Sequence, residues 1–204
     1  MERQHGPWTV QGTTRMYHNP FLEVYEDRVI QPDGQPGLYA TVTMSPGVAV
    51  LPVDDHGCVY LTRQFRYALG QESLEVVSGA VGANEPILEA ARRELREEVG
   101  IAADAWTALG RVDPDTSIVR EPVWLFLAEH LRFISPEPQG TESVQPVKLP
   151  GAEAVRQVLV GGITHAPSCV LILKAHLARA ALAQGDAMVA NTPSPLSPFR
   201  TPAS

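Results

Sequence analysis

The N-terminal part of the chain alternates hydrophobic and polar positions in short segments that Pro, Gly and Asn separate. β-branched and aromatic residues dominate these segments, as is typical of strands, and the separators favour turns. The pattern predicts strands at residues 8–17, 21–30 and 38–44. Because a two-stranded ribbon is only marginally stable in water, we expect the first two strands to need a partner, either the main sheet or another subunit.

The rest of the chain predicts further strands and two C-terminal helices. The strands are expected at residues 47–53, 58–67, 105–112 and 123–128. The first of them is almost wholly apolar, which places it centrally in a sheet. The helices are expected at residues 152–159 and 169–183, and the Pro- and Gly-containing segments 113–120 and 135–150 are interpreted as connections.

Residues 79–101 combine a glycine loop, an amphipathic helix and a glycine stop. Asn84 or Glu85 can cap the start of the helix, and Pro86 suits its first turn. Gly100 is the expected left-handed residue at its end. At helical spacing one arc should face the core, and its residues are Leu88, Ala91, Leu95 and Val99.

A second face of this helix concentrates negative charge. Glu94, Glu97 and Glu98 lie three or four residues apart or side by side, so they repel one another. Anions in the last turn are also disfavoured by the helix dipole. A bound divalent cation would offset both penalties, and Mg²⁺ prefers carboxylate and carbonyl oxygens. The alternative is a solvated charged helix, since three interspersed arginines leave the segment nearly neutral.

The complete string resembles the Nudix box, G-x5-E-x7-R-E-U-x-E-E-x-G-U, in which U is a bulky aliphatic residue. Each fixed position and both spacers agree with that pattern, which makes the motif specific. The matching residues are Gly79, Glu85, Arg93, Glu94, Leu95, Glu97, Glu98, Gly100 and Ile101.

This resemblance implies roles for individual residues. The implied metal ligands are Glu94, Glu97, Glu98 and the backbone carbonyl of Ser78, with Mg²⁺ as the cofactor and Mn²⁺ as the alternative. Glu97 and Arg93 are also implied in catalysis. The implied function of Arg93 and Glu85 is to orient the carboxylates, and that of Gly100 is structural.

Two neighbouring segments resemble one branch of the Nudix hydrolases, which acts on ADP-ribose and sugar nucleotides. Gln64–Tyr67 resembles its Q-[YF]-R-Y element, and Ser73–Gly79 resembles its E-x-x-[AS]-G approach to the box. The resemblance implies that Arg66, Glu75 and Gly79 bind substrate. An exposed strand arginine and a surface strand glutamate are the alternatives for Arg66 and Glu75.

The same branch implies a general base in a loop after the box. We assign this role to Glu121, with Asp115 as the alternative, although Asp113–Thr116 lacks the glycine of the usual S-P-G loop. The run Gly161–Ser168 also resembles the C-terminal part of the branch. Within it, His165 is interpreted as a residue at the start of a helix rather than as a catalyst.

Composition narrows the choice of partner and compartment. A net charge of −7 argues against a surface that coats nucleic acid. The N-terminus lacks an apolar signal core and no apolar run is long enough to span a membrane, so we predict no membrane partner. Cys58 and Cys169 are interpreted as buried thiols, which fits a reducing compartment. We therefore predict a cytoplasmic protein.

The expected fold class is α/β (α+β), namely the Nudix fold, a mixed sheet sandwiched between helices. We expect an N-terminal antiparallel ribbon at residues 1–45, which forms part of a homodimer interface, a Nudix domain at 46–184 and a disordered tail at 185–204. The strand aromatics Trp8, Tyr17, Phe21 and Tyr25 could stack on a base or belong to the core.

The resemblance implies metal-dependent hydrolysis of the pyrophosphate bond of ADP-ribose or a related nucleoside diphosphate sugar, giving a nucleoside monophosphate and a sugar phosphate. Two alternatives remain open. One is a Nudix-fold module that senses a nucleotide without turnover. The other is a hydrolase of a dinucleotide or a triphosphate.

Overall fold

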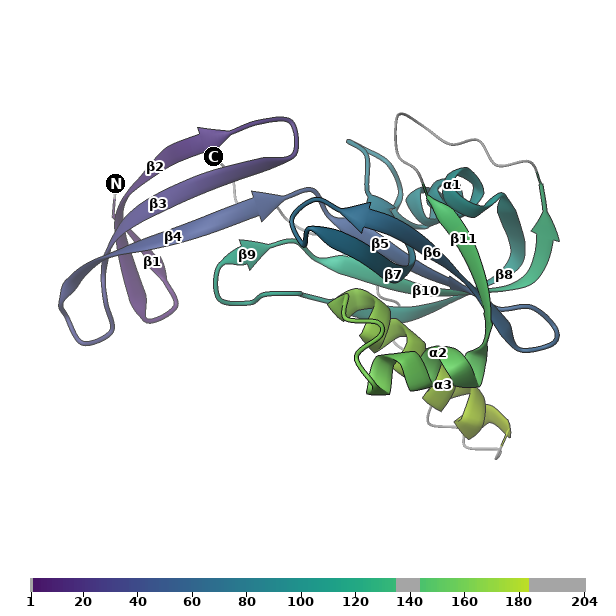
Figure 1. Ribbon diagram of the computed structural model, residues 1–204. Coiled ribbons are helices and arrows are strands. Elements are labelled where there is room, and N and C mark those ends of the chain that lie inside the picture. The colour runs from purple at the N-terminus through teal and green to yellow at the C-terminus, as the bar shows by residue number, and fades with distance from the viewer. Residues whose placement is uncertain (1, 135–143, 184–204) are drawn as a thin grey trace. The chain divides into compact units, whose positions relative to one another are not determined.

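The computed structural model describes residues 2–134 and 144–183 (Figure 1). The chain divides into two compact units. The first consists of the residues up to Pro46 together with Asp113–Pro122, and the second contains the rest of the described chain. The segment 113–122, which the sequence places in the main domain, therefore groups with the N-terminal strands.

The first unit is a five-stranded sheet with the order β1-β2-β3-β4-β9. Its strands are β1 (Arg3–His5), β2 (Trp8–His18), β3 (Leu22–Ile30), β4 (Pro36–Met44) and β9 (Val119–Arg120). The pairs β1–β2, β2–β3 and β3–β4 are antiparallel, and β9 pairs in parallel with β4. The predicted N-terminal strands are confirmed. The ribbon of β2 and β3 finds its partners within the chain, in β1 and in the predicted strand β4. The strands β1 and β9 are too short and polar for periodicity to reveal.

The second unit contains a six-stranded sheet with the order β11-β6-β7-β5-β10-β8. Its strands are β5 (Gly47–Pro52), β6 (Cys58–Arg66), β7 (Gln71–Ala80), β8 (Ile101–Val112), β10 (Val123–Phe133) and β11 (Gln145–Pro150). The central strand β5 is buried throughout, as its apolar sequence predicts. It pairs in parallel with β10 and antiparallel with β7, so the predicted mixed sheet is confirmed.

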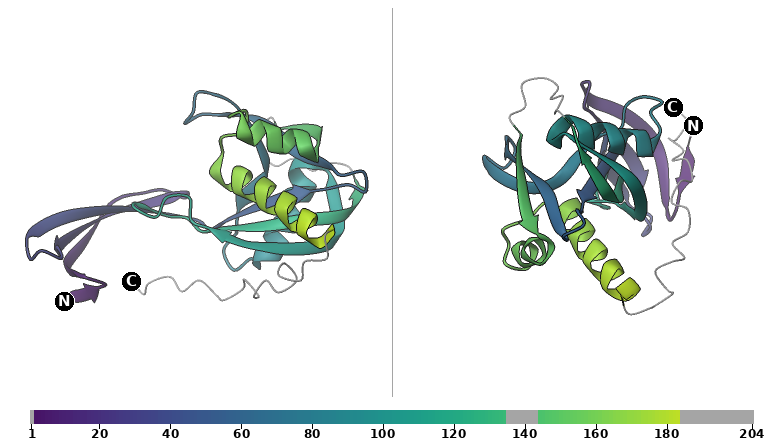
Figure 2. Two further views of the ribbon diagram at one scale, coloured as in Figure 1. Left: turned by 90° about the horizontal axis from the view of Figure 1, so that it is seen from below. Right: turned by 90° about the vertical axis from the view of Figure 1, so that its right-hand side faces the viewer.

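Helices cover both faces of this sheet (Figures 1 and 2). They are α1 (Ile87–Val99), α2 (Gly151–Leu159) and α3 (Ala166–Ala183). Side chains alternate along β5, so Val48 and Val50 pack in one apolar cluster with α1, whereas Ala49 and Leu51 pack in another with α2 and α3. The predicted sandwich of a sheet between helices is confirmed.

The strands β11 and β8 differ from the prediction. β11 lies in a segment interpreted as an irregular connector because it contains Pro146 and Pro150. The strand forms nonetheless because it lies at the edge of the sheet, where a missing N–H on the outer side costs no ladder hydrogen bond. β8 begins at Ile101, directly after the helix stop, rather than at Ala105.

The helix α1 confirms the predicted end and corrects the predicted start. Gly100 is left-handed, with φ of 62°, and its N–H donates to the carbonyl of Arg96. Pro86 occupies the cap position without a side-chain cap, so neither Asn84 nor Glu85 caps the helix. Asn84 is itself left-handed, with φ of 62°, which turns the chain before the helix begins. The predicted apolar arc faces the core, with Ala91 and Leu95 fully buried.

Other sequence expectations have mixed outcomes. Tyr17 and Phe21 are not core residues, because they are 56% and 75% exposed. Cys58 and Cys169 are unpaired but only partly buried. The predicted tail and much of the connector before β11 lie outside the described residues. Within the described ranges, no helix combines the length and apolarity needed to cross a membrane.

A carboxylate holds the turn between β5 and β6. Asp54 Oδ1 accepts the N–H groups of His56 (3.0 Å) and Cys58 (2.9 Å), and Oδ2 accepts from Lys148 Nζ (2.8 Å) and the Tyr60 hydroxyl (3.2 Å). These bonds, the one from Lys148 first, outweigh the opposing effect of burial and lower the pKa of Asp54 from 3.8 to about 2. The ionised form therefore stabilises the folded state.

This pKa predicts how stability depends on pH. A folded-state pKa below the unfolded value contributes stability that is present above about pH 4 and is lost as pH falls toward 2. We expect Asp54→Asn to flatten the fall of the unfolding free energy over this interval, as measured by urea denaturation. Asp55→Asn, at the exposed neighbour, is the control and should follow the unmodified protein. Equal slopes for all three proteins would contradict the prediction.

Candidate functional site

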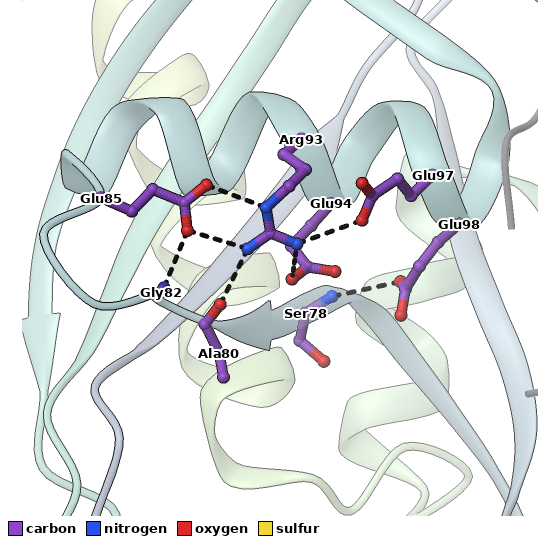
Figure 3. A network of polar contacts seen from close by, with 8 residues as sticks. All are labelled: Ser78, Ala80, Gly82, Glu85, Arg93, Glu94, Glu97 and Glu98. Carbon is purple, nitrogen blue, oxygen red and sulfur yellow. Dashed lines mark hydrogen bonds and ion pairs between the residues drawn. The ribbon is translucent and has the colours of Figure 1, made fainter. Parts of the chain in front are cut away.

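A single arginine connects the residues of the box (Figure 3). Arg93 Nε donates to Glu85 Oε1 (2.8 Å), and Nη2 donates to Glu85 Oε2 (3.0 Å) and to the Ala80 carbonyl (2.9 Å). Nη1 donates to Glu94 Oε1 (2.6 Å) and Glu97 Oε2 (3.1 Å). The guanidinium thus lies between the loop that precedes α1 and two carboxylates of the helix itself.

In this cluster three carboxylates, those of Glu85, Glu94 and Glu97, share the positive charge of Arg93, and several pKa values are shifted. The hydrogen bonds to Arg93 lower the pKa of Glu85, and they raise the pKa of Arg93 well above its ordinary value. Burial raises the pKa of Glu94, and the charges of Glu97 and Glu85 add to this, although Arg93 opposes it. The cluster therefore keeps an excess of negative charge that a further cation would neutralise.

The third carboxylate of the helix faces the neighbouring strand. Glu98 Oε2 accepts the backbone N–H of Ser78 at 3.4 Å (Figure 3). Ser78 lies on β7, where it pairs with Ala49 of the buried β5. The sheet thus places Ser78 at the end of a rigid strand beside the last turn of α1.

Gly79 provides the space that the Glu94 carboxylate occupies. A Cβ added to Gly79 would lie 2.1 Å from Glu94 Cδ and 2.2 and 2.4 Å from its two oxygens. Any side chain at this position would therefore displace the carboxylate. The substrate-binding role of Gly79 stays a prediction. The packing explains why position 79 is a glycine, because a side chain there would overlap the Glu94 carboxylate.

The donor set suits a hard divalent cation by its chemistry. Glu94, Glu97, Glu98 and the carbonyl of Ser78 offer only oxygen atoms, which Mg²⁺ and Mn²⁺ accept. The space left by the missing side chain of Gly79 also holds the Glu94 carboxylate against β7, the strand that carries Ser78. In residues 2–134 and 144–183 no three His, Cys, Asp or Glu side chains converge as a metal-binding group, and Glu94 and Glu97 are directed at Arg93. The residues therefore fit a cation by the type of their donor atoms.

Gly79→Ala tests whether the space beside Gly79 is needed to position the Glu94 carboxylate. The new methyl group would overlap the Glu94 carboxylate, so we expect a loss of activity of roughly 10²-fold, as for other misplacements of about 1 Å in active sites. The thermal unfolding temperature should change little. Steady-state kinetics at several Mg²⁺ concentrations would measure the effect, with Ala80→Ser at the exposed neighbour as the control. Unchanged activity would show that the position of Glu94 does not matter.

A second polar cluster lies on the hairpin formed by β6 and β7. Arg66 binds Glu75 through two hydrogen bonds, Nε to Oε1 (3.0 Å) and Nη2 to Oε2 (2.6 Å). Glu75 is 2% exposed, so it is no surface glutamate. Burial raises the pKa of Glu75, but the hydrogen bond and charge of Arg66, the charge of His165 and a hydrogen bond from Ser73 together outweigh burial and lower it. Arg66 remains partly exposed, as a ligand-binding residue must be.

Sequence reasoning missed two members of this cluster. His165 Nδ1 lies 3.4 Å from Glu75 Oε2 and 2.8 Å from Ser168 Oγ. The only sequence signal was the Gly161–Ser168 pattern, in which His165 was interpreted as a residue at the start of a helix. That position is confirmed, because α3 begins at Ala166. The contact with Glu75 was not predicted.

The two candidates for a general base belong to the first unit. Asp115 is exposed, and its Oδ1 accepts both the N–H (2.8 Å) and the hydroxyl (2.6 Å) of Ser117. These bonds lower the pKa of Asp115. Glu121 is partly buried, and burial raises its pKa, which brings it closer to the value that suits a base near neutral pH. The local environment therefore favours Glu121.

The first unit also contains a pocket of about 420 Å³. Trp8 and Tyr39 contribute an edge-on aromatic pair with centroids 5.4 Å apart, and Asp27, Ile118 and Arg120 line the same space. Apolar aromatic walls beside a carboxylate suit a planar heterocycle that carries a hydrogen-bond donor.

Comparison with protein families agrees with this geometry. Residues 43–158 match the NUDIX domain. The chain belongs to the Nudix family. Residues 8–42, ahead of that match, correspond to the nucleoside diphosphate sugar hydrolase N-terminal domain. This Nudix protein thus carries a box in which Arg93 contacts Glu85, Glu94 and Glu97.

Named relatives of this Nudix protein include two hydrolases. The ADP-ribose pyrophosphatase of Mycobacterium tuberculosis is 30% identical over 184 residues, which cover 89% of this chain and 88% of that protein. ADP compounds hydrolase NudE of Escherichia coli is 34% identical over 111 residues, 53% of this chain and 55% of that protein. The crystal structure of an ADP compounds hydrolase aligns with a TM-score of 0.74 at 21% identity, covering 90% of this chain and 99% of that chain. This last likeness establishes the fold.

Proposed function

We propose that this Nudix protein hydrolyses the pyrophosphate bond of ADP-ribose or a related nucleoside diphosphate sugar, giving a nucleoside monophosphate and a sugar phosphate. The observation that carries the proposal is the assembled box, in which Arg93 holds Glu85, Glu94 and Glu97 together. The choice of substrate is supported by the relative named ADP-ribose pyrophosphatase, which aligns with 89% of the chain.

The residues of the box have distinct tasks in this proposal. The residues that would hold Mg²⁺, or Mn²⁺ as the alternative, are Glu94, Glu97, Glu98 and Ser78 through its carbonyl. When bound, the cation neutralises phosphate oxygens and lowers the pKa of a water molecule. Arg93 keeps the carboxylates in place, and Glu85 in turn fixes Arg93 through two hydrogen bonds.

Residues outside the box bind substrate and move a proton. Arg66 contacts the phosphate or the terminal sugar, since a guanidinium matches phosphate oxygens geometrically, and Glu75 sets its orientation. Glu121 accepts the proton of the attacking water.

A panel of substrates tests the function. Purified protein is incubated with ADP-ribose, other nucleoside diphosphate sugars, dinucleotides and nucleoside triphosphates, with Mg²⁺, with Mn²⁺ and with chelator. Cation-dependent release of AMP, fastest from ADP-ribose, is the expected result. Preference for a triphosphate or a dinucleotide would overturn the substrate assignment. Binding of ADP-ribose without any cleavage would instead indicate a sensing module.

We also propose that the protein is a homodimer whose interface includes the first unit. Large apolar side chains are exposed on its strands and turns, and they are Met16, Tyr17, Phe21 and Leu38. Contiguous exposed apolar patches are typical of interfaces, and the proposal requires these side chains to contribute to one. Size-exclusion chromatography with light scattering at micromolar concentration should give twice the mass of the chain, and a monomer would overturn the proposal. A cytoplasmic location stays a prediction from the sequence.

A further inference from the structure

The start of α3 is attached to the edge of β7 by a buried serine. The pairing of β7 with β5 extends only to Val77, so the next N–H group, that of Val76, needs another acceptor. Ser168 Oγ provides it at 3.0 Å, and the serine is fully buried. This contact ties the first turn of α3 to the strand that carries Glu75.

His165 is held in place from two sides. Its carbonyl accepts the N–H of Cys169 at 3.0 Å, in the first turn of the helix, which fixes its backbone. Its imidazole Nδ1 lies 2.8 Å from Ser168 Oγ, which restricts the ring. The ring then faces Glu75 Oε2 at 3.4 Å, and its side chain is 31% exposed.

Glu75 therefore has polar neighbours on two sides. Arg66 binds both carboxylate oxygens, and His165 lies against the oxygen that accepts the shorter of these bonds. A bidentate bond requires the carboxylate and the guanidinium to be nearly coplanar. A contact that restricts the orientation of the Glu75 carboxylate therefore also restricts the orientation of the Arg66 guanidinium plane.

We propose that His165, supported by Ser168, is a positioning residue that orients the Glu75 carboxylate and thereby the Arg66 guanidinium for an anionic group of the substrate. This inference rests on the proposed function of Arg66 in substrate binding. The start of α3, some ninety residues after Glu75 in the chain, thereby contributes to substrate affinity. This contribution is separate from that of the box.

Two matched substitutions test the inference. In His165→Asn, a polar atom of the side-chain amide takes the position of Nδ1. In His165→Gln, the side chain is one bond longer, so a polar atom of the amide takes the position of Nε2 instead. We expect His165→Gln and His165→Ala to raise KM for ADP-ribose roughly 10-fold with kcat nearly unchanged, because a residue that acts only through the orientation of a binding group changes binding rather than the chemical step. His165→Asn should restore most of the affinity. Thr164→Ala, at the exposed neighbour, is the control, and unfolding temperatures confirm that each variant folds.

A double-mutant cycle adds a second criterion. If His165 acts through Arg66, His165→Gln should raise KM no further in a protein that already carries Arg66→Ala. Additive effects, or an unchanged KM in the Gln and Ala variants, would overturn the inference.

A measurement without substrate separates this inference from the proposed function. In the ¹H–¹⁵N spectrum, the Nε–H of Arg66, which is bonded to Glu75, should give a resolved signal. His165→Gln should broaden or shift that signal, and His165→Asn should not. If the protein fails to cleave ADP-ribose while the signal responds as expected, the proposed function fails and the positioning role stands. An unaffected signal overturns the positioning role, even if ADP-ribose is cleaved.

Discussion

Replacing Glu98 with glutamine is expected to abolish most of the hydrolysis of ADP-ribose while the fold survives. Glutamine has the same shape as glutamate and can still accept the N–H of Ser78, so this contact of Glu98 with the strand is retained. It lacks the negative charge that a divalent cation requires. Loss of a supporting partner at a metal site typically costs 10–100-fold, so loss of a ligand should lower kcat by more than about 10²-fold.

The measurement combines kinetics with calorimetric titration of Mg²⁺. Glu98→Gln should weaken cation binding in parallel with the loss of turnover, and the urea denaturation midpoint should stay close to that of the unmodified protein. Glu89→Gln is the matched control, because Glu89 is an exposed residue of the same helix, paired with Arg92. If Glu98→Gln kept more than a tenth of the activity, Glu98 would not be a metal ligand.

Arg93→Ala is expected to have the largest effect on stability. The substitution leaves Glu85, Glu94 and Glu97 without their shared cation, and the side chains of Glu94 and Glu97 are only 13% and 11% exposed. Breaking a buried ion pair from one side costs 3–5 kcal/mol. We expect about 3 kcal/mol, at the lower end, because the Arg93 side chain is 28% exposed and water can reach part of the cluster.

Arg92→Ala provides the comparison for this loss. Arg92 lies next in the helix and pairs with Glu89, but both side chains are about half exposed, at 48% and 54%. Such pairs contribute about 0–1 kcal/mol, so this variant should unfold almost as the unmodified protein does. Urea denaturation of both variants gives the two free energies. Mg²⁺ should stabilise Arg93→Ala more than the unmodified protein, because it can replace the missing charge. Equal losses in the two variants would contradict the role of Arg93 as the centre of the cluster.

Much of the site could be predicted because its residues are close in sequence. Glu94, Glu97 and Glu98 share one region of the helix surface since helical geometry repeats about every 3.6 residues, whatever the rest of the chain does. Gly100 ends the helix for an equally local reason, its freedom to adopt a positive φ. The strands β2 to β6 and β10 follow from apolar periodicity. The local pattern also contained the box by which the family was inferred and then confirmed.

The tertiary structure decided those features that require contact between segments distant in the sequence. The residues of β9 join the N-terminal sheet and those of β11 add an edge strand, although both sequences are too short or too rich in proline to predict a strand. His165 contacts Glu75 because the start of α3 lies beside β7, where Ser168 accepts the N–H of Val76. Gly79 must be glycine because a carboxylate from another element fills the space of its side chain. Periodicity reveals what a segment can form, whereas the packing of the sheet and its helices determines which side chains meet.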